Sequence, residues 1–236
     1  MTNSSPIIAA GVSAITIADL WVGYGQAPVL RDLSLNLAAG RSLGIAGPNG
    51  SGKSTLFKAI LGLIPPSRGE IAILGRRLAA ERDRAWVRRQ VGYVPQQLFP
   101  GRLPVSVLDA VLMGRWGKTF GFFKHPGAAD RSAARQALLE VGLVGHERSD
   151  CRSLSGGEQQ KVAIARALVR DASILLLDEP TTYLDQRSKA DLVAMIERLR
   201  HQRRLTVVTV SHDAGHLREI TDVILRLRDG RLEEMP

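Results

Sequence analysis

Residues 47–55 constrain the fold more than any other stretch of the chain. They read Gly-Pro-Asn-Gly-Ser-Gly-Lys-Ser-Thr, which matches the pattern G-x-x-x-x-G-K-[ST] at every fixed position. A short apolar run at 41–46 comes before them, and 56–61 reads as the first turns of a helix. A glycine-rich turn that happens to precede a helix is the alternative, but the number of matched positions argues against it. The pattern predicts a phosphate-binding P-loop in an α/β fold.

Each fixed position of this loop has a chemical reason. Gly47, Gly50 and Gly52 let the backbone wrap closely enough to point N–H groups at phosphate oxygens, and the helix that follows adds its dipole. Lys53 supplies positive charge to the β- and γ-phosphates, and the Ser54 hydroxyl is placed to bind Mg²⁺. The predicted nucleotide-binding residues of the loop are Gly47, Pro48, Asn49, Gly50, Ser51, Gly52, Lys53, Ser54 and Thr55.

Length and composition indicate a globular protein. The chain has 236 residues, 44% of them hydrophobic, which is enough for one large domain or two small ones. Its single cysteine forms no intrachain disulfide, which fits a cytosolic protein. No segment approaches the roughly 20 apolar residues needed to cross a bilayer, and the N-terminus lacks the features of a secretory signal. We therefore expect a cytoplasmic protein that is not itself a channel.

The net charge of +9 is compatible with nucleic-acid binding, with attraction to an anionic membrane face, or with a basic surface alone. Arginines cluster at 76–89 and again at 198–204, and we interpret both clusters as solvated helix faces. Neither cluster carries the interleaved aromatics that bind single-stranded nucleic acid. No nucleic-acid partner is expected.

The strand patterns fall into two kinds. Residues 15–20 and 29–37 alternate apolar and polar side chains, which predicts antiparallel strands with one covered face. The continuous apolar runs at 173–178 and 205–210 predict parallel strands that are buried on both faces. Further strands are predicted at 70–75, at 91–94, and at 223–227 before the hairpin signal Asp229-Gly230.

The middle of the chain is different. Four of the five phenylalanines and Trp116 lie between 98 and 127, and helical patterns follow at 129–141 and 157–169. We interpret about 96–165 as a helical insertion in a single α/β domain whose core spans about 1–95 and 166–236. The aromatic stretch 99–123 is expected to include a surface for a partner, or else to fill the core of the insertion itself.

Two acidic residues close the run at 173–178. The Asp178 carboxylate is placed to hold Mg²⁺ through water, and Glu179 to orient the water that attacks the γ-phosphate. Together with the P-loop, the pair predicts nucleotide hydrolysis.

Residues 154–159, Leu-Ser-Gly-Gly-Glu-Gln, closely resemble the LSGGQ signature of ATP-binding cassette (ABC) proteins. The resemblance covers nearly the whole chain. It implies a RecA-like P-loop NTPase core with an antiparallel β-subdomain and a helical signature subdomain, and an ATPase that uses ATP and Mg²⁺. It also implies a head-to-tail homodimer around two ATP, in which Ser155, Gly156 and Gly157 bind the γ-phosphate held by the P-loop of the second copy.

Four further positions match this family in order. Tyr24 corresponds to the aromatic that stacks on adenine, Gln96 to the Q-loop ligand of Mg²⁺ that senses the γ-phosphate, and Asp185 to the D-loop acid. His212 corresponds to the switch histidine that holds Glu179, water and γ-phosphate together.

Alternatives and departures remain at some of these positions. A tyrosine packed at a strand end is the alternative for Tyr24. For His212 the alternatives are a metal site with His216 at i, i+4 and a plain core or surface histidine. Glu158 stands where glutamine is commoner, and Thr182-Tyr183 where the D-loop often reads Ser-Ala. Neither departure touches a catalytic group.

A single cassette without a membrane segment has to borrow its pore from another chain. We therefore expect an ATPase that is peripheral on the inner face of the cell membrane and works with a permease and, indirectly, a substrate-binding protein. The stretch 111–131 is similar to zinc and manganese importer ATPases, and 178–185 to those of iron-siderophore and cobalamin importers, which favours metal or metal-chelate import. The ATPase of an exporter and a non-transport ABC ATPase acting on nucleic acid are the alternatives.

Overall fold

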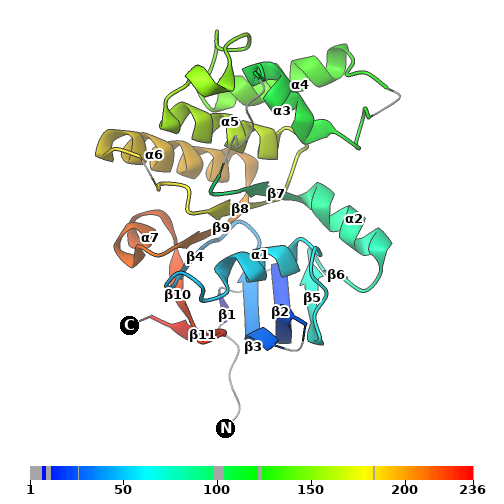
Figure 1. The fold of residues 1–236 in the computed structure, drawn as a ribbon, viewed down its shortest axis with the longest axis vertical. Helices are drawn as coiled ribbons and strands as arrows, with labels where there is room; N and C mark the ends of the chain where they lie inside the picture. Colours follow the sequence, from blue (N-terminus) through cyan, green and yellow to red (C-terminus); the bar gives the residue numbers. More distant parts are fainter. Residues whose placement is uncertain are drawn as a thin grey trace.

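The computed structural model describes residues 7–8, 12–25, 27–97, 104–121, 124–182 and 184–235. It is an α/β protein with two sheets and a layer of helices (Figure 1). Among the helices of these residues, none combines the length and the apolar character of a membrane span.

The first sheet is five-stranded and mostly antiparallel. β2 pairs antiparallel with both β3 and β5, and its side chains Ile15 and Ile17 are buried against α1 while alternate positions are more exposed. The prediction of antiparallel strands with one covered face is confirmed. In spatial order the strands are β1 (Ile7–Ile8), β3 (Ala27–Ala38), β2 (Ser13–Tyr24), β5 (Arg68–Ile73) and β6 (Arg76–Arg77).

The second sheet has six strands, and all neighbours except the last hairpin are parallel. Every residue of β4, β8 and β9 is buried, because helices cover both faces. This explains the continuous apolar runs in the sequence. In spatial order the strands are β11 (Arg231–Glu234), β10 (Val223–Arg228), β4 (Ser42–Ala46), β9 (Thr206–Ser211), β8 (Ile174–Asp178) and β7 (Val91–Val94).

Helix α1 (Lys53–Ile60) joins the two sheets. Its apolar residues Leu56, Phe57 and Ile60 belong to one buried cluster with side chains of both sheets. The other core helices are α2 (Glu81–Gln90), α6 (Gln186–Arg203) and α7 (Ala214–Ile220).

A helical layer covers the opposite face of the parallel sheet (Figure 1). It packs in a second buried cluster with α6 and with β8, and its helices lie where the sequence patterns predicted them. The division of the domain at about 96 and 165 stays a proposal. The elements of this layer are α3 (Val107–Leu112), η1 (Met113–Arg115), α4 (Ala128–Glu140), η2 (Cys151–Ser153) and α5 (Gly156–Leu168).

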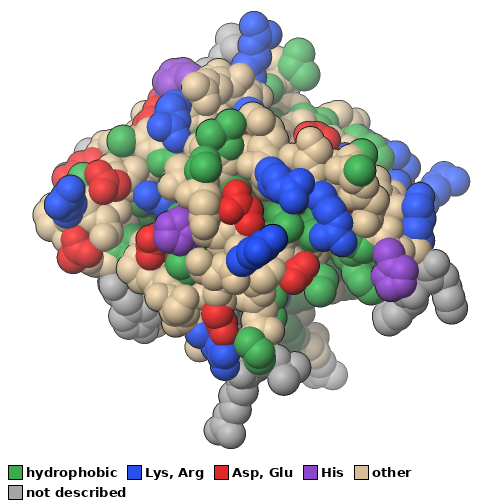
Figure 2. Space-filling model, turned by 90° about the horizontal axis from the view of Figure 1, so that it is seen from above, with side chains coloured by type: hydrophobic (Ala, Val, Ile, Leu, Met, Phe, Trp, Pro, Cys, Tyr) green, Lys and Arg blue, Asp and Glu red, His purple; other side chains and the backbone are tan. Residues whose placement is uncertain are grey.

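The interpretation of both arginine clusters as solvated helix faces is wrong in part. Arg76 lies on β6, where its guanidinium is 2.7 Å from the Asp83 carboxylate and stacks over Trp86. The Arg203 guanidinium is 2.8 Å from the Glu140 carboxylate at the end of α4, and Arg200 pairs with Asp222 at 3.1 Å. The Arg76 pair joins β6 to α2, and the pairs of Arg200 and Arg203 join α6 to its neighbours. On the face in Figure 2, basic side chains lie in small groups among acidic and apolar ones.

The aromatic stretch is divided between core and surface. Phe120 is buried in the helical layer, with its ring edge-on to Trp116 at 5.6 Å between centroids. This favours the core alternative for Phe120, whereas Trp116 is partly exposed. Phe99, Phe122 and Phe123 lie outside the described residues, as does Tyr183.

Candidate active site

The P-loop connects the buried strand β4 to α1 and needs its glycines. Gly52 has φ 107°, and a Cβ atom there would come within 2.8 Å of Leu30. A Cβ at Gly47 would come within 2.6 Å of the Leu227 carbonyl oxygen. The loop borders a pocket of about 320 Å³, called here the P-loop pocket, which is lined by Val29, Asn49, Gly50, Gly52, Lys53, Ser54, Thr55, Gln96, Asp178 and Glu179.

Lys53 is held inside this loop. Its Nζ donates to the carbonyl oxygens of Gly47 at 2.7 Å and Pro48 at 3.0 Å, and lies 4.0 Å from Oε1 of Glu179. Burial lowers the pKa of Lys53, while the negative charges of Glu179 and Asp178 oppose the shift. The Lys53 side chain is thus only 8% exposed at the pocket, where phosphate oxygens are the anions it is placed to meet. Ser51, in the same loop, has a buried hydroxyl without a hydrogen-bond partner among the described residues.

Asp178 stands at the carboxyl end of β8 and accepts two hydrogen bonds on Oδ2. Ser54 donates from Oγ at 3.3 Å, and Tyr93 donates from its hydroxyl at 3.1 Å. Burial raises the pKa of Asp178, and these two hydrogen bonds oppose that shift. Burial and the Asp178 charge raise the pKa of Tyr93, so the phenol stays a donor.

The same oxygens suit a magnesium ion. A hydroxyl and a carboxylate within 3.3 Å of each other are hard oxygen ligands, which Mg²⁺ prefers. Gln96, an exposed residue just after β7, lines the same pocket and adds an amide oxygen. The residues of this chain therefore fit Mg²⁺ beside a bound phosphate.

Glu179 follows in a strained backbone conformation with φ 51°. His212 contacts both of its carboxylate oxygens, through its backbone N–H to Oε1 at 2.9 Å and through Nδ1 to Oε2 at 2.9 Å. Ser211 and Thr182 donate to Oε2 at 3.2 and 3.3 Å. The acid that the sequence assigned to water activation is thus fixed at the edge of the P-loop pocket.

The tyrosine assigned to adenine lies at the exposed end of β2. The Tyr24 side chain is 53% exposed, and its hydroxyl is 3.3 Å from Nζ of Lys58 on α1. The hydrogen bond to Lys58 is the main reason why the pKa of Tyr24 is lowered. Tyr24 is the last residue of β2, and Nζ of Lys58 lies 5.7 Å from its ring centroid, so the alternative of a tyrosine packed at a strand end stays open. Stacking on adenine stays a prediction.

The metal-site alternative for His212 and His216 finds no support. His212 contacts Glu179, whereas Nδ1 of His216 is 3.6 Å from Glu219 on its own helix. In the described ranges, no group of three or more His, Cys, Asp or Glu side chains is arranged to hold a metal ion.

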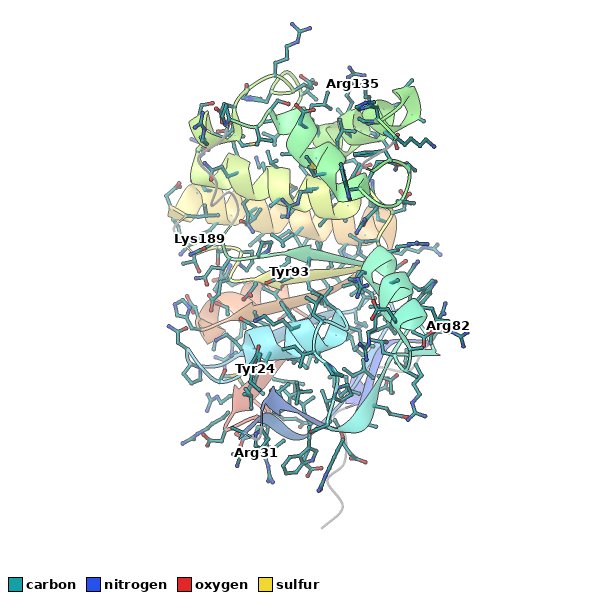
Figure 3. All side chains as sticks on the ribbon, turned by 45° about the vertical axis from the view of Figure 1, so that its right-hand side comes forward. Tyr24, Arg31, Arg82, Tyr93, Arg135 and Lys189 are labelled. Carbon is teal, nitrogen blue, oxygen red and sulfur yellow. The ribbon has the colours of Figure 1, made fainter. Side chains whose placement is uncertain are left out.

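The signature residues begin α5, away from the pocket. Ser155 caps the helix in a reciprocal box with Glu158: its Oγ accepts from the Glu158 backbone N–H at 3.4 Å, and its own backbone N–H donates to Glu158 Oε2 at 2.9 Å. Gly156 and Gly157 pack beside Leu184 and Ser188. The strands of the parallel sheet lie between α5 and α1 in Figures 1 and 3.

Asp185 also lies outside the P-loop pocket. It caps α6 by accepting from the Ser188 backbone N–H at 3.0 Å and from the Ser188 hydroxyl at 2.6 Å. Within one chain, Ser155, Gly156, Gly157 and Asp185 do not line the P-loop pocket. The other predicted residues that do not line it are Tyr24, Gly47, Pro48, Ser51 and His212, of which His212 contacts Glu179.

Comparison with known proteins gives a consistent picture. A family model described as "ABC transporter" matches residues 30–182. The manganese transport system ATP-binding protein MntB of Bacillus subtilis is 39% identical over 90% of this chain and 82% of its own length. The zinc transport system ATP-binding protein TroB of Treponema pallidum is 38% identical over 93% of this chain and 80% of its own length.

Solved structures agree with the fold. The dimeric structure of MJ0796, a bacterial ABC transporter cassette, has a TM-score of 0.78 and 31% identity, and covers 93% of this chain and 97% of that one. The same cassette has been solved as a dimer in a post-hydrolysis state with ADP and Pi.

Proposed function

Because the chain belongs to the ABC transporter family, a family of ATPase cassettes, we propose that its ATP hydrolysis powers import of a metal ion or metal chelate through a separate permease. The similarity to manganese and zinc transport proteins supports the cargo class. One observation carries the chemistry: Lys53, Ser54, Asp178 and Glu179 line one pocket, and His212 contacts Glu179.

The proposed reaction follows from these positions. Lys53 neutralises charge on the β- and γ-phosphates, and Glu179 accepts a proton from the water whose oxygen attacks the γ-phosphorus. The bond from γ-phosphorus to the bridging oxygen breaks and leaves ADP. Mg²⁺, held by Ser54, Asp178 and Gln96, supplies further positive charge to the phosphates when bound. His212 keeps the Glu179 carboxylate aimed at the water.

We place the missing part of the site on a second copy of the chain. Ser155, Gly156, Gly157 and Asp185 lie outside the pocket of their own chain, and a head-to-tail pairing brings them to the P-loop of the partner. The likeness to a dimeric cassette supports this arrangement. Each of two nucleotides is then closed between a P-loop and a signature serine.

The permease is proposed to bind in a groove of about 630 Å³ beside the edge strand β7, called here the docking groove. Its rim carries the partly exposed Trp116 and Met113, which is 54% exposed. Three arginines line the groove, of which Arg88 pairs with Glu81 at 2.9 Å. The positive charge of Arg166 and Arg170 favours the acidic or C-terminal end of a permease helix. The groove is lined by Leu61, Arg88, Val91, Gly92, Tyr93, Met113, Gly114, Trp116, Arg166, Ala167 and Arg170.

Uptake of radioactive manganese and zinc by whole cells tests the proposal. Cells that lack this chain should take up less of the cargo metal, and the wild-type chain, but not Glu179→Gln, should restore uptake. Higher metal accumulation in the deleted cells would identify an exporter. Unchanged manganese, zinc, ferric-siderophore and cobalamin uptake would contradict metal import.

A further inference from the structure

We propose that Tyr93 is a positioning residue of the metal site, because its hydroxyl fixes the Asp178 carboxylate in the orientation in which that carboxylate meets the cation. The inference rests on the proposed function, since it concerns the Mg²⁺ that accompanies ATP. It assigns a role to a residue that none of the motifs in this sequence contains.

The register of two parallel strands brings the two side chains together. β7 pairs with β8 so that Tyr93 is opposite Leu176. Alternate residues of a strand share a face, so Asp178, two positions after Leu176, lies on the same side of the sheet as Tyr93. The phenol reaches along this face and donates to Oδ2 of Asp178 at 3.1 Å.

Helix α1 holds the ring in place. Phe57, itself almost fully buried, packs edge-on to Tyr93 with 6.1 Å between ring centroids and an interplanar angle of 83°. Phe57 lies three residues after Ser54, so the helix that carries one metal ligand also supports the ring that orients the other. In the view of Figure 3, Tyr93 lies between the parallel sheet and α1.

The hydrogen bonds of Asp178 distinguish the role of Tyr93 from that of Ser54. The terminal torsion of a carboxylate is broad, so an aspartate needs donors to fix its plane. Ser54 and Tyr93 both donate to Oδ2, and no side-chain hydrogen bond seen among the described residues ends on Oδ1. Ser54 is itself a predicted ligand, whose lone pairs can meet the cation while its proton is donated to Asp178. Tyr93 is the donor that is not a predicted ligand, so its one contact with this site is the bond that orients the carboxylate.

The test is a binding measurement on Tyr93→Phe, which keeps the ring and removes only the hydroxyl. Manganese replaces magnesium as a probe, and the free ion is followed by electron paramagnetic resonance during titration of the protein–ADP complex. We expect the variant to bind Mn²⁺ roughly tenfold more weakly, the scale of one lost hydrogen bond to a charged group. Its ADP affinity in EDTA should equal that of the wild type.

Thr221→Val is the matched control. It removes a hydroxyl that donates to the Leu217 carbonyl oxygen at 2.8 Å. Thr221 follows the last residue of α7 and does not line the P-loop pocket, so Mn²⁺ affinity should be unchanged. Ser54→Ala, which removes a proposed ligand, should weaken Mn²⁺ binding and shows that the assay reports on the site.

Two results would overturn the positioning role while leaving the proposed function intact. One is a Mn²⁺ affinity of Tyr93→Phe within twofold of wild type when Ser54→Ala is impaired. The other is an equal loss of Mn²⁺ affinity and of metal-free ADP affinity, which would mean that the hydroxyl supports the whole pocket. A wild-type protein that binds neither ADP nor Mn²⁺ with ADP would instead contradict the proposed function, and this inference with it.

Discussion

His212 contacts both oxygens of the Glu179 carboxylate, through its backbone N–H at 2.9 Å and through Nδ1 at 2.9 Å. In His212→Ala the backbone contact stays and the ring contact is lost, so Oε2 of Glu179 loses its shortest contact and is held only by the longer ones from Ser211 and Thr182. We predict that turnover falls about 100-fold or more, on the scale of lost general-base catalysis, with ATP affinity little changed. Phosphate release under saturating ATP measures this, with His216→Ala as the control. Equal turnover in the two variants would show that the His212 side chain has no role in hydrolysis.

Lys53→Ala is predicted to abolish ATP hydrolysis and to weaken ATP binding by about tenfold or more, because it removes the charge aimed at the β- and γ-phosphates. The exposed Lys124, in the helical layer, provides a control for charge alone: Lys124→Ala should behave as wild type. Steady-state turnover measures the loss of hydrolysis, and equilibrium binding of a fluorescent ATP analogue measures the loss of affinity. Undiminished hydrolysis by the Lys53 variant would disprove the P-loop assignment.

Asp130 predicts how stability depends on pH. Its carboxylate accepts hydrogen bonds from Thr119, from Nε of Arg115 at 2.8 Å and from the Gly127 N–H at 2.9 Å. These contacts, led by those of Thr119 and Arg115, lower the pKa of Asp130 from its ordinary 3.8 to about 2. A carboxyl whose pKa is lower in the folded state stabilises the fold above its unfolded pKa, and that contribution is lost as pH falls through the folded pKa.

We therefore expect Asp130→Asn to lower the free energy of unfolding by about 1–3 kcal/mol at pH 7, as for a lost hydrogen bond to a charged group. The difference from wild type should be smaller at pH 3, inside the window between 3.8 and about 2. Urea unfolding at the two pH values measures both, and the exposed Asp191→Asn is the control. A difference that is as large at pH 3 as at pH 7 would contradict the role given to the ionised carboxylate.

The docking groove is tested with two exposed apolar residues of the helical layer. Met113 lies on the groove and Leu139, 55% exposed, does not. We predict that Met113→Asp releases the chain from membranes of the cells that express it, because it places a charge at an apolar contact, whereas Leu139→Asp stays bound. Co-sedimentation with those membranes is the measurement, and ATPase activity in solution confirms that both variants fold. Equal membrane binding of the two variants would show that the permease does not bind in the docking groove.

Part of this site is readable from the sequence because its residues are close together in the chain. The P-loop is one continuous segment, and Asp178 and Glu179 directly follow a recognisable buried strand. The partners of Glu179 and Asp178 are harder to find. Tyr93 is 85 residues from Asp178, and only the register of β7 against β8 shows that they meet. A polar ring in an otherwise apolar strand is the one local sign.

Ion pairs between residues far apart in the chain are equally hard to predict from the sequence. Arginines on a helix look solvated in sequence, but Arg203 pairs with Glu140, 63 residues away. Ser211, which donates to Glu179, was missed for a related reason: it is the last residue of β9, and its position beside Asp178 and Glu179 follows from strand order rather than from any motif.

In the proposed mechanism, a second copy of the chain completes each active site, and ATP hydrolysis lets the two copies separate. Glu179→Gln keeps the size and hydrogen bonding of the side chain but removes the charge needed to activate water. ATP should still bind through Lys53 and Ser54 and should remain between a P-loop and the Ser155 of the partner copy.

Size-exclusion chromatography of Glu179→Gln with each nucleotide tests this claim most directly. We predict a dimer with ATP and a monomer with ADP, because ADP lacks the γ-phosphate that the signature serine contacts. A second variant, Glu179→Gln with Ser155→Arg, should stay monomeric with either nucleotide. A monomeric Glu179→Gln in the presence of ATP, or hydrolysis by that variant at the wild-type rate, would contradict the account.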